Sequence, residues 1–379
     1  MYTPTSVIRD GAVLVRDGRI EKVGPRREIA RGDLETMDVE GNLICPGFID
    51  LQVNGGGGSL LTEDASYESV CRIAKTHSSF GTTSLMPTVI TAPEKQIRKA
   101  LSAVSEAVHR GTGTAYVIGS HLEGPFINGK KRGIHDQRFL LPPSIDHFSP
   151  FYEASQGTLR LLTLAPELPN SLAVIEHAAS MGVAVAIGHT IAGLSEVERA
   201  VDAGATLATH VFNAMEGPGG RDPGTVGAIL SIDEVHAGLI ADGIHVHPMS
   251  MKVCIRAKGT DRVFLVTDAM PPVGTSMTSF RLYDEEINVK EGGLYGPDGT
   301  IAGSILTMNR AVKIVNELVG IPLDKAIAMA TINPAVAAGI GHEKGSLQPG
   351  KDADIVICDH ELNVRKVMVR GEVVYEVSS

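Results

Sequence analysis

The sequence predicts a (β/α)8 TIM-like barrel joined to a small β-sandwich domain that is built from both chain termini. Between residues 47 and 346, short apolar runs alternate with longer stretches of helical pattern, which is typical of repeated βα units around a parallel sheet. Both ends of the chain carry β-branched runs around turn residues instead. The length of 379 residues also suits one large barrel with a small appendage.

The terminal segments have the pattern of antiparallel strands. Segment 11–24 holds two β-branched runs joined at residues 17–18, an Asp-Gly pair that favours a β-hairpin. Segments 353–358 and 364–375 alternate apolar and polar residues. Neither end is large enough to bury a sheet alone, so we expect the two ends to pair. The predicted divisions are residues 1–46 and 347–379 for the small β domain, and residues 47–346 for the barrel.

Eight short apolar runs are the candidate barrel strands. They cover residues 43–53, 83–88, 115–122, 159–165, 183–188, 206–211, 236–241 and 263–267. Candidate helices with apolar residues at three- and four-residue spacing cover residues 67–79, 93–110, 171–181, 194–203 and 249–257. We expect residues 279–303, after the eighth strand, to form a separate β excursion.

Composition excludes several classes of protein. The formal net charge is -10, and no basic run is longer than residues 130–132, so a nucleic acid is not an expected partner. The four cysteines include no C-x-x-C pair, which indicates free thiols in a reducing compartment. No run of about 18 apolar residues and no signal-like start is present, so we expect a cytoplasmic protein without membrane association.

Polar residues follow several predicted strands and indicate a metal site. Glu123 ends the third strand, and His189 and His210 follow the fifth and the sixth. In a parallel barrel the carboxyl ends of the strands converge on one mouth. A lone histidine is more often structural than a ligand, but the joint placement of these three residues favours a catalytic divalent metal with an open position for water.

Asp268 follows the eighth strand without a partner in its own segment. A carboxylate beside an activated water can take up the proton of that water during attack and return it to the leaving group. Asp268 is therefore the predicted general base and acid.

Six motifs occur in order along nearly the whole chain. They are PGFIDLQVNG at 46–55, HLEGPF at 121–126, GHT at 188–190, THVFNAM at 209–215, ADGIH at 241–245 and LVTDA at 265–269. Together these motifs resemble those of one family, the N-acetylglucosamine-6-phosphate deacetylases of the amidohydrolase superfamily.

The resemblance implies the same barrel and β-sandwich, and it implies roles for single residues. Glu123, His189 and His210 would be the metal ligands and Asp268 the catalytic acid/base. His135 would bind substrate and stabilise the oxyanion, and Arg221 would bind the phosphate. The remaining substrate-binding residues that it implies are Ile134, Asn213, Ala214, His245, Ile301, Ala302 and Gly303.

One departure from the wider superfamily bears on the metal content. Most relatives carry His-x-His after the first strand, but Gln52 and Asn54 occupy those positions here. Neutral amides are poor ligands, so we expect one divalent metal per subunit, with Gln52 able to contact it through a water. Zn²⁺ is the expected ion, and Fe²⁺, Co²⁺ and Mn²⁺ suit the same ligands.

The activity implied is hydrolysis of N-acetyl-D-glucosamine 6-phosphate to D-glucosamine 6-phosphate and acetate. The expected partner is thus a small phosphorylated amino sugar. In the family a phosphate-binding residue can come across a dimer interface, which implies a homodimer and leaves open whether Arg221 or His245 acts across it. Two alternatives remain: a cyclic-amide hydrolase resembling dihydroorotase, and a non-catalytic scaffold with the same fold.

Overall fold

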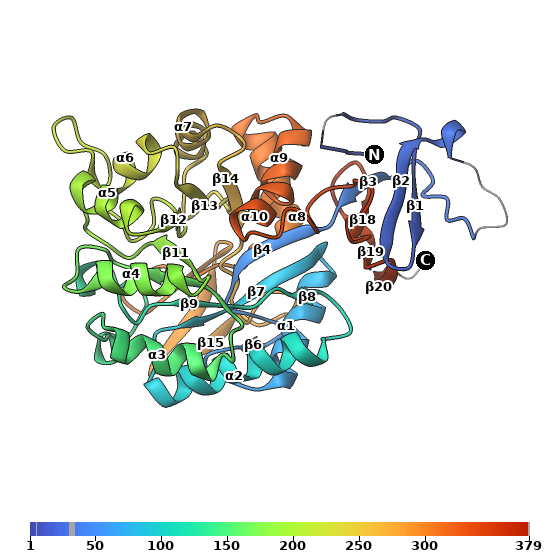
Figure 1. Ribbon diagram of the computed structural model, residues 1–379. Helices are drawn as coiled ribbons and strands as arrows, with labels where there is room; N and C mark the ends of the chain where they lie inside the picture. The colour runs from blue at the N-terminus through green and yellow to red at the C-terminus, as the bar shows by residue number, and fades with distance from the viewer. Residues whose placement is uncertain (5, 30–34, 378–379) are drawn as a thin grey trace.

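The computed structural model describes residues 1–4, 6–29 and 35–377; residues 5, 30–34 and 378–379, which belong to the predicted terminal segments, lie outside the description. Eight parallel strands form a barrel in the order β14-β13-β12-β11-β10-β9-β7-β4 (Figure 1). A parallel bridge between Val53 and Ala269 joins the first strand to the end of the last and closes the barrel. The strands are β4 (Phe48–Val53), β7 (Thr82–Ile90), β9 (Ser120–Glu123), β10 (Leu159–Leu164), β11 (Ala184–Ile187), β12 (Ala205–Ala208), β13 (His236–Ile240) and β14 (Val263–Val266).

The predicted barrel is confirmed, and helices surround it. Their apolar faces pack on the outside of the strands in one continuous hydrophobic core. Strands covered in this way are buried on both faces, which is why they read as apolar runs. The helices are α1 (Tyr67–Ser78), α2 (Glu94–Arg110), α3 (Ile145–Ala154), α4 (Ser171–Ser180), α5 (Leu194–Asp202), α6 (Gly224–Ser231), α7 (Pro248–Lys258), α8 (Met308–Ile314), α9 (Leu323–Met329) and α10 (Ile332–Ala337).

Two predicted strands are each divided in the structure. The run 43–53 forms β3 (Leu43–Pro46), which belongs to the small β domain, and then β4 of the barrel. The division falls at Gly47, where an added Cβ would lie 2.0 Å from Thr83 Oγ1, so the chain passes close to β7 as it enters the barrel. Likewise, the run 115–122 forms the short β8 (Tyr116–Val117) and then β9.

Among the helices that lie between barrel strands, α3 and α6 lack a predicted counterpart. Pro150 lies inside α3, and a proline usually ends a helix, which obscures the helical pattern there. The sequence of α6, GTVGAILS, contains no charged residue and two glycines, so it lacks the polar face that marks an amphipathic helix. Both helices are nevertheless placed between consecutive barrel strands, as the βα pattern requires.

The two chain ends meet in the small β domain at the right of Figure 1. Strands β1 (Gly11–Arg16) and β2 (Arg19–Pro25) pair as the predicted antiparallel hairpin. Strand β3 joins a four-stranded sheet in the order β20-β19-β18-β3. A separate hydrophobic cluster, which includes Ile20 of β2 and Ile355 of β18, lies between the hairpin and this sheet. The remaining strands of the sheet are β18 (Ile355–Cys358), β19 (Val364–Val369) and β20 (Glu372–Glu376).

A buried ion cluster lies between the barrel and the small domain. Lys344 follows α10, and its Nζ lies 2.8 Å from Oδ2 of Asp352 and 2.8 Å from Oδ2 of Asp354, just before β18. The Lys344 side chain is 1% exposed, and its ammonium group also sits over the ring of Tyr116. The charges are thus paired, as burial of an ammonium group requires.

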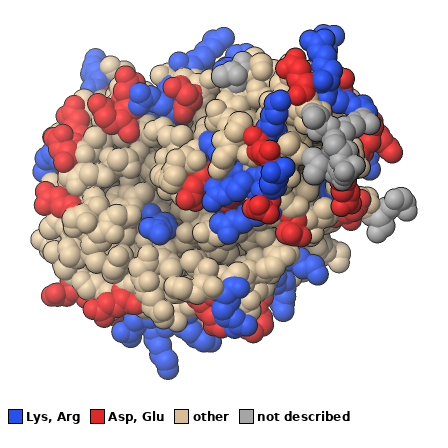
Figure 2. All heavy atoms as spheres, turned by 45° about the vertical axis from the view of Figure 1, so that its right-hand side comes forward, with Lys and Arg blue, Asp and Glu red and all other residues tan. Residues whose placement is uncertain are grey.

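The predicted excursion after β14 is a three-stranded antiparallel sheet of β15 (Ser279–Leu282), β16 (Glu285–Lys290) and β17 (Gly293–Tyr295). Basic and acidic side chains are interspersed on the face of the molecule shown in Figure 2. Among the described residues, no helix is long and apolar enough to cross a membrane.

Candidate active site

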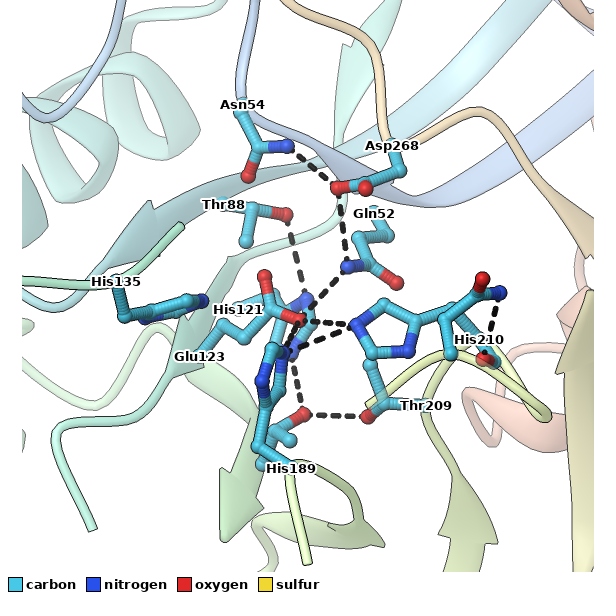
Figure 3. A network of polar contacts seen from close by, with 12 residues as sticks. Gln52, Asn54, Thr88, His121, Glu123, His135, His189, Thr209, His210 and Asp268 are labelled. Carbon is cyan, nitrogen blue, oxygen red and sulfur yellow. Dashed lines mark hydrogen bonds and ion pairs between the residues drawn. The ribbon is translucent and has the colours of Figure 1, made fainter. Parts of the chain in front are cut away.

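The three predicted metal ligands meet at the carboxyl ends of their strands (Figure 3). Glu123 is the last residue of β9, and His189 and His210 lie in the turns after β11 and β12. Oε1 of Glu123 lies 2.9 Å from Nε2 of His210 and 3.3 Å from Nε2 of His189, and the two Nε2 atoms are 3.1 Å apart. Among the described residues, this is the one group of three or more such side chains that could hold a metal ion.

The protonation of this cluster suits metal binding. Nδ1 of His189 lies 2.9 Å from the backbone oxygen of Lys131, which can only accept a hydrogen bond. Nδ1 therefore carries the proton, and Nε2 directs a lone pair into the cluster. Burial pushes the pKa of Glu123 upward, but the adjacent imidazoles of His189 and His210 bring it well below its ordinary value. One carboxylate and two imidazoles, all buried, form a donor set that fits Zn²⁺ and similar divalent ions.

Two of the expected metal ligands and Asp268 have left-handed backbone conformations. The φ angles are 50° for His189, 27° for His210 and 51° for Asp268. Non-glycine residues in this region are strained, and such strain is concentrated at functional sites. The turn after each strand thus directs its side chain into the barrel mouth.

Two amides connect the metal cluster to Asp268. Gln52 lies in β4, and Asn54 directly follows that strand. Because every second residue of an extended chain points to the same side, the two side chains face the same way. Nε2 of Gln52 donates to Oε1 of Glu123 at 2.9 Å and to Oδ1 of Asp268 at 3.2 Å. Nδ2 of Asn54 donates to the same Oδ1 at 2.6 Å. Gln52, predicted to reach the metal through a water, thus directly contacts one of the expected ligands.

Burial sets the protonation of the acid/base candidate. It raises the pKa of Asp268 to about 6, and the nearby charge of Glu123 contributes to the rise. Oδ1 of Asp268 receives both amide donors, while Oδ2 has no hydrogen-bond partner among the described residues. Asp268 can therefore both accept and release a proton near neutral pH.

A cavity of about 350 Å³ opens above these residues. It brings together most of the predicted substrate-binding residues with Glu123, His189, His210 and Asp268. Those in its wall are Ile134, His135, Asn213, Ala214, His245, Ile301 and Gly303. The cavity is large enough for a small ligand and has polar groups on a partly apolar wall, as ligand sites usually do.

Two histidines in the wall are held through Nδ1. Burial lowers the pKa of His135 to about 3, so its imidazole is neutral. Its ring lies edge-on to that of His189, with centroids 4.6 Å apart. Nδ1 of His245 lies 2.6 Å from Oδ2 of Asp242. The other oxygen of this carboxylate, Oδ1, accepts hydrogen bonds from the backbone N–H groups of Ile244 and His245. His245 lines the cavity formed by this chain.

Two predicted residues lie outside the cavity wall. Arg221 lies on the exposed loop between β12 and α6 and is not part of the wall. Ala302 is fully buried and packs in a hydrophobic cluster with residues of the three-stranded sheet. Its neighbours in the chain, Ile301 and Gly303, both line the cavity.

The wall also contains two lysines that are not among the predicted site residues. Lys130 and Lys131 line the cavity, and Nζ of Lys131 lies 2.9 Å from Oε1 of Glu216. The available signal was the basic run 130–132, just before the segment that contains His135.

Comparisons with known proteins agree with this geometry. Residues 43–374 match the family model described as "Amidohydrolase family". The chain is 37% identical to N-acetylglucosamine-6-phosphate deacetylase of Bos taurus, over 99% of this chain and 95% of that protein. It is 34% identical to N-acetylgalactosamine-6-phosphate deacetylase of Escherichia coli O157:H7, over 98% of this chain and 97% of that protein.

A solved structure shows the same fold. The crystal structure of N-acetylglucosamine-6-phosphate deacetylase from Pasteurella multocida superposes with a TM-score of 0.93 at 33% identity, covering 98% of this chain and 97% of that one. The match of both sequence and fold extends across the barrel and the small β domain. The chain therefore belongs to the amidohydrolase family and, within it, to the group of the N-acetylglucosamine-6-phosphate deacetylases.

Proposed function

We propose that this protein hydrolyses the acetamide of N-acetyl-D-glucosamine 6-phosphate to D-glucosamine 6-phosphate and acetate. One observation carries the proposal: a carboxylate with an elevated pKa, Asp268, faces the same cavity as a buried Glu/His/His group. The names of the relatives supply the substrate class. The catalysis would take place in the barrel of residues 47–346, and residues 1–46 and 347–379 would form the small domain.

Glu123, His189 and His210 would hold one divalent metal per subunit, with Zn²⁺ as the proposed ion and Fe²⁺, Co²⁺ or Mn²⁺ as alternatives. When bound, such an ion supplies Lewis-acid chemistry, which makes water more acidic and polarises a carbonyl oxygen. Gln52 supports this site because its amide orients the Glu123 carboxylate.

Asp268 would carry the proton through the reaction. Its carboxylate accepts a proton as water adds to the amide carbon, and it then delivers that proton to the nitrogen as the C–N bond breaks. Gln52 and Asn54 hold Oδ1, which leaves Oδ2 for this transfer. The neutral ring of His135 would donate a hydrogen bond to the oxygen on which negative charge develops.

The phosphate would position the acetamide without taking part in the reaction. The backbone at Asn213 and Ala214, together with His245, would contact the sugar phosphate, and Ile134, Ile301, Ala302 and Gly303 would form the rest of the binding site. Because Arg221 lies outside the wall of its own cavity, we place it at a phosphate of a second subunit in a homodimer. The four free cysteines fit a cytoplasmic location.

The test is release of acetate from metal-quantified protein. The panel contains N-acetylglucosamine and N-acetylgalactosamine, each with and without the 6-phosphate, because both sugars occur in the names of relatives. We expect turnover of at least the phosphorylated glucosamine derivative, and much slower turnover of the free sugars. Ring opening of dihydroorotate without acetate release would favour the cyclic-amide hydrolase. Absence of bound metal, with no gain on adding it, would favour the scaffold.

A further inference from the structure

The ring of His135 is held by a threonine from a different strand end. Thr91 directly follows β7, and His135 lies in the loop after β9. Oγ1 of Thr91 is 2.8 Å from Nδ1 of His135. In Figure 3 the ring extends toward the cluster of Glu123, His189 and His210. The ring lines the cavity, and its Nε2 has no hydrogen-bond partner among the described residues.

The direction of this hydrogen bond follows from the surroundings of Thr91. Its side chain is fully buried, and Nδ1 of His135 is the one partner that the described residues offer to Oγ1. If the hydroxyl donates to Nδ1, its hydrogen is satisfied and the imidazole proton resides on Nε2. The opposite tautomer would leave a buried O–H group without an acceptor, which costs roughly 1–3 kcal/mol.

Neighbouring groups restrict where the hydroxyl can be. The phenol of Tyr283, in the turn between β15 and β16, donates to the backbone oxygen of Thr91. Gly124 also lies close to the hydroxyl, because an added Cβ on Gly124 would lie 2.4 Å from Oγ1 of Thr91. Arg132 donates to the backbone oxygen of His135 at 2.8 Å. Thus both residues of the pair are anchored through their main chains.

We propose that Thr91 is a positioning residue that keeps the proton of His135 on Nε2, so that the ring offers an N–H donor to the acetyl oxygen of the substrate. The inference rests on the proposed deacetylation. A donor aimed at the developing negative charge lowers the barrier, whereas a lone pair at the same place would repel it. The substrate itself is held by other groups, so the effect of Thr91 falls on kcat more than on KM.

Two substitutions at Thr91 distinguish the effect of the hydroxyl from the effect of the branched shape of the side chain. Thr91→Val removes the hydroxyl and preserves the branched shape, while Thr91→Ser retains the hydroxyl. The control is Thr83→Val, which removes a buried hydroxyl from β7, the strand that Thr91 follows; that hydroxyl donates to the backbone oxygen of Phe48. We expect Thr91→Val to lower kcat by roughly 10- to 100-fold, short of the full loss of an oxyanion donor. Thr91→Ser and Thr83→Val should stay near wild type, and KM should change little in all three.

A second readout does not need the substrate. In ¹⁵N-histidine-labelled protein, long-range ¹H–¹⁵N spectra distinguish protonated from unprotonated ring nitrogens, and His135→Gln identifies the signals of His135. We expect Nε2 to be protonated in the wild type and in Thr91→Ser, and the proton to be distributed over both nitrogens in Thr91→Val.

A proton on Nδ1 of the wild-type ring would overturn the inference, as would an unchanged kcat in Thr91→Val. An equal loss of kcat in Thr91→Ser and Thr91→Val would also overturn it, because the hydroxyl would then not be the cause. If the wild type releases no acetate, the proposed function fails, while the spectra still decide the tautomer that Thr91 imposes.

Discussion

The substitution Asp268→Asn tests the proton transfer with little change to the fold. The carboxylate Oδ1 accepts from Nδ2 of Asn54 at 2.6 Å and from Nε2 of Gln52 at 3.2 Å. The oxygen of an asparagine can accept the same two hydrogen bonds, which places its NH₂ group where Oδ2 was. The side chain therefore keeps its orientation but can no longer take up a proton. Asp268→Ala would be a poorer choice, because it leaves both amides without this acceptor.

The expected loss is large because one carboxylate serves two proton transfers. A positioned acid or base typically contributes 10²- to 10⁴-fold to a rate, which corresponds to about 3–5 kcal/mol of barrier. We expect kcat for acetate release to fall by at least roughly 10²-fold, with little change in KM. The Glu123, His189 and His210 side chains are not altered, so the metal content should stay near that of the wild type.

The assay combines steady-state acetate release, metal analysis and thermal unfolding of the same preparation. Asp64→Asn is the matched control, since Asp64 bonds Ser59 and Ser66 near the mouth but does not line the cavity. It should retain kcat. A variant Asp268→Asn that keeps more than about a tenth of the wild-type kcat would refute the assignment of Asp268, since a tenfold loss is below the range for acid–base catalysis.

Three further predictions concern binding and stability. Arg221→Ala should raise KM for the phosphorylated substrate far more than for the free sugar, and equal effects would remove its phosphate role. Burial lowers the pKa of His77 to about 4. Between pH 6.5 and 4 the unfolded chain therefore binds more protons than the folded chain. As the pH is lowered through this window, the free energy of unfolding should fall by up to about 3 kcal/mol relative to that of His77→Gln. Parallel pH profiles from urea denaturation would contradict this. Lys344→Met leaves the buried Asp354 carboxylate without its cation, while Asp352 keeps its ion pairs with Arg19 and Arg370, and it should cost about 3–5 kcal/mol. Adding Asp354→Asn should recover part of the loss, and additive losses in that double-mutant cycle would argue against a coupled cluster.

Much of the site could be predicted because of a rule of topology. The carboxyl ends of parallel strands meet at one mouth, so Glu123, His189 and His210 could be expected together before any coordinates were known. The structure places their ligand atoms within 4.8 Å of one another. The division of the run 43–53 could not be predicted, because it depends on the close approach of Gly47 to Thr83.

Contacts between separate loops were also beyond the sequence. The pair Lys131 and Glu216 joins loops that follow different strands, and Arg221 lies outside the wall of the cavity. Loop conformations depend on many weak contacts with the rest of the surface, so residue spacing along the chain does not determine them.

By itself the sequence determined the chemistry that is available: a barrel pattern, one carboxylate and two imidazoles at strand ends, two amides in place of the usual histidine pair, and a second carboxylate in Asp268. Only the tertiary structure decided which nitrogen of His189 presents a lone pair, which oxygen of Asp268 remains available, and which hydroxyl holds His135. The reason is physical. Hydrogen bonds act over about 3 Å and depend on direction, and burial shifts a pKa only once the surrounding chain has excluded water, so both effects arise from residues that meet through folding alone.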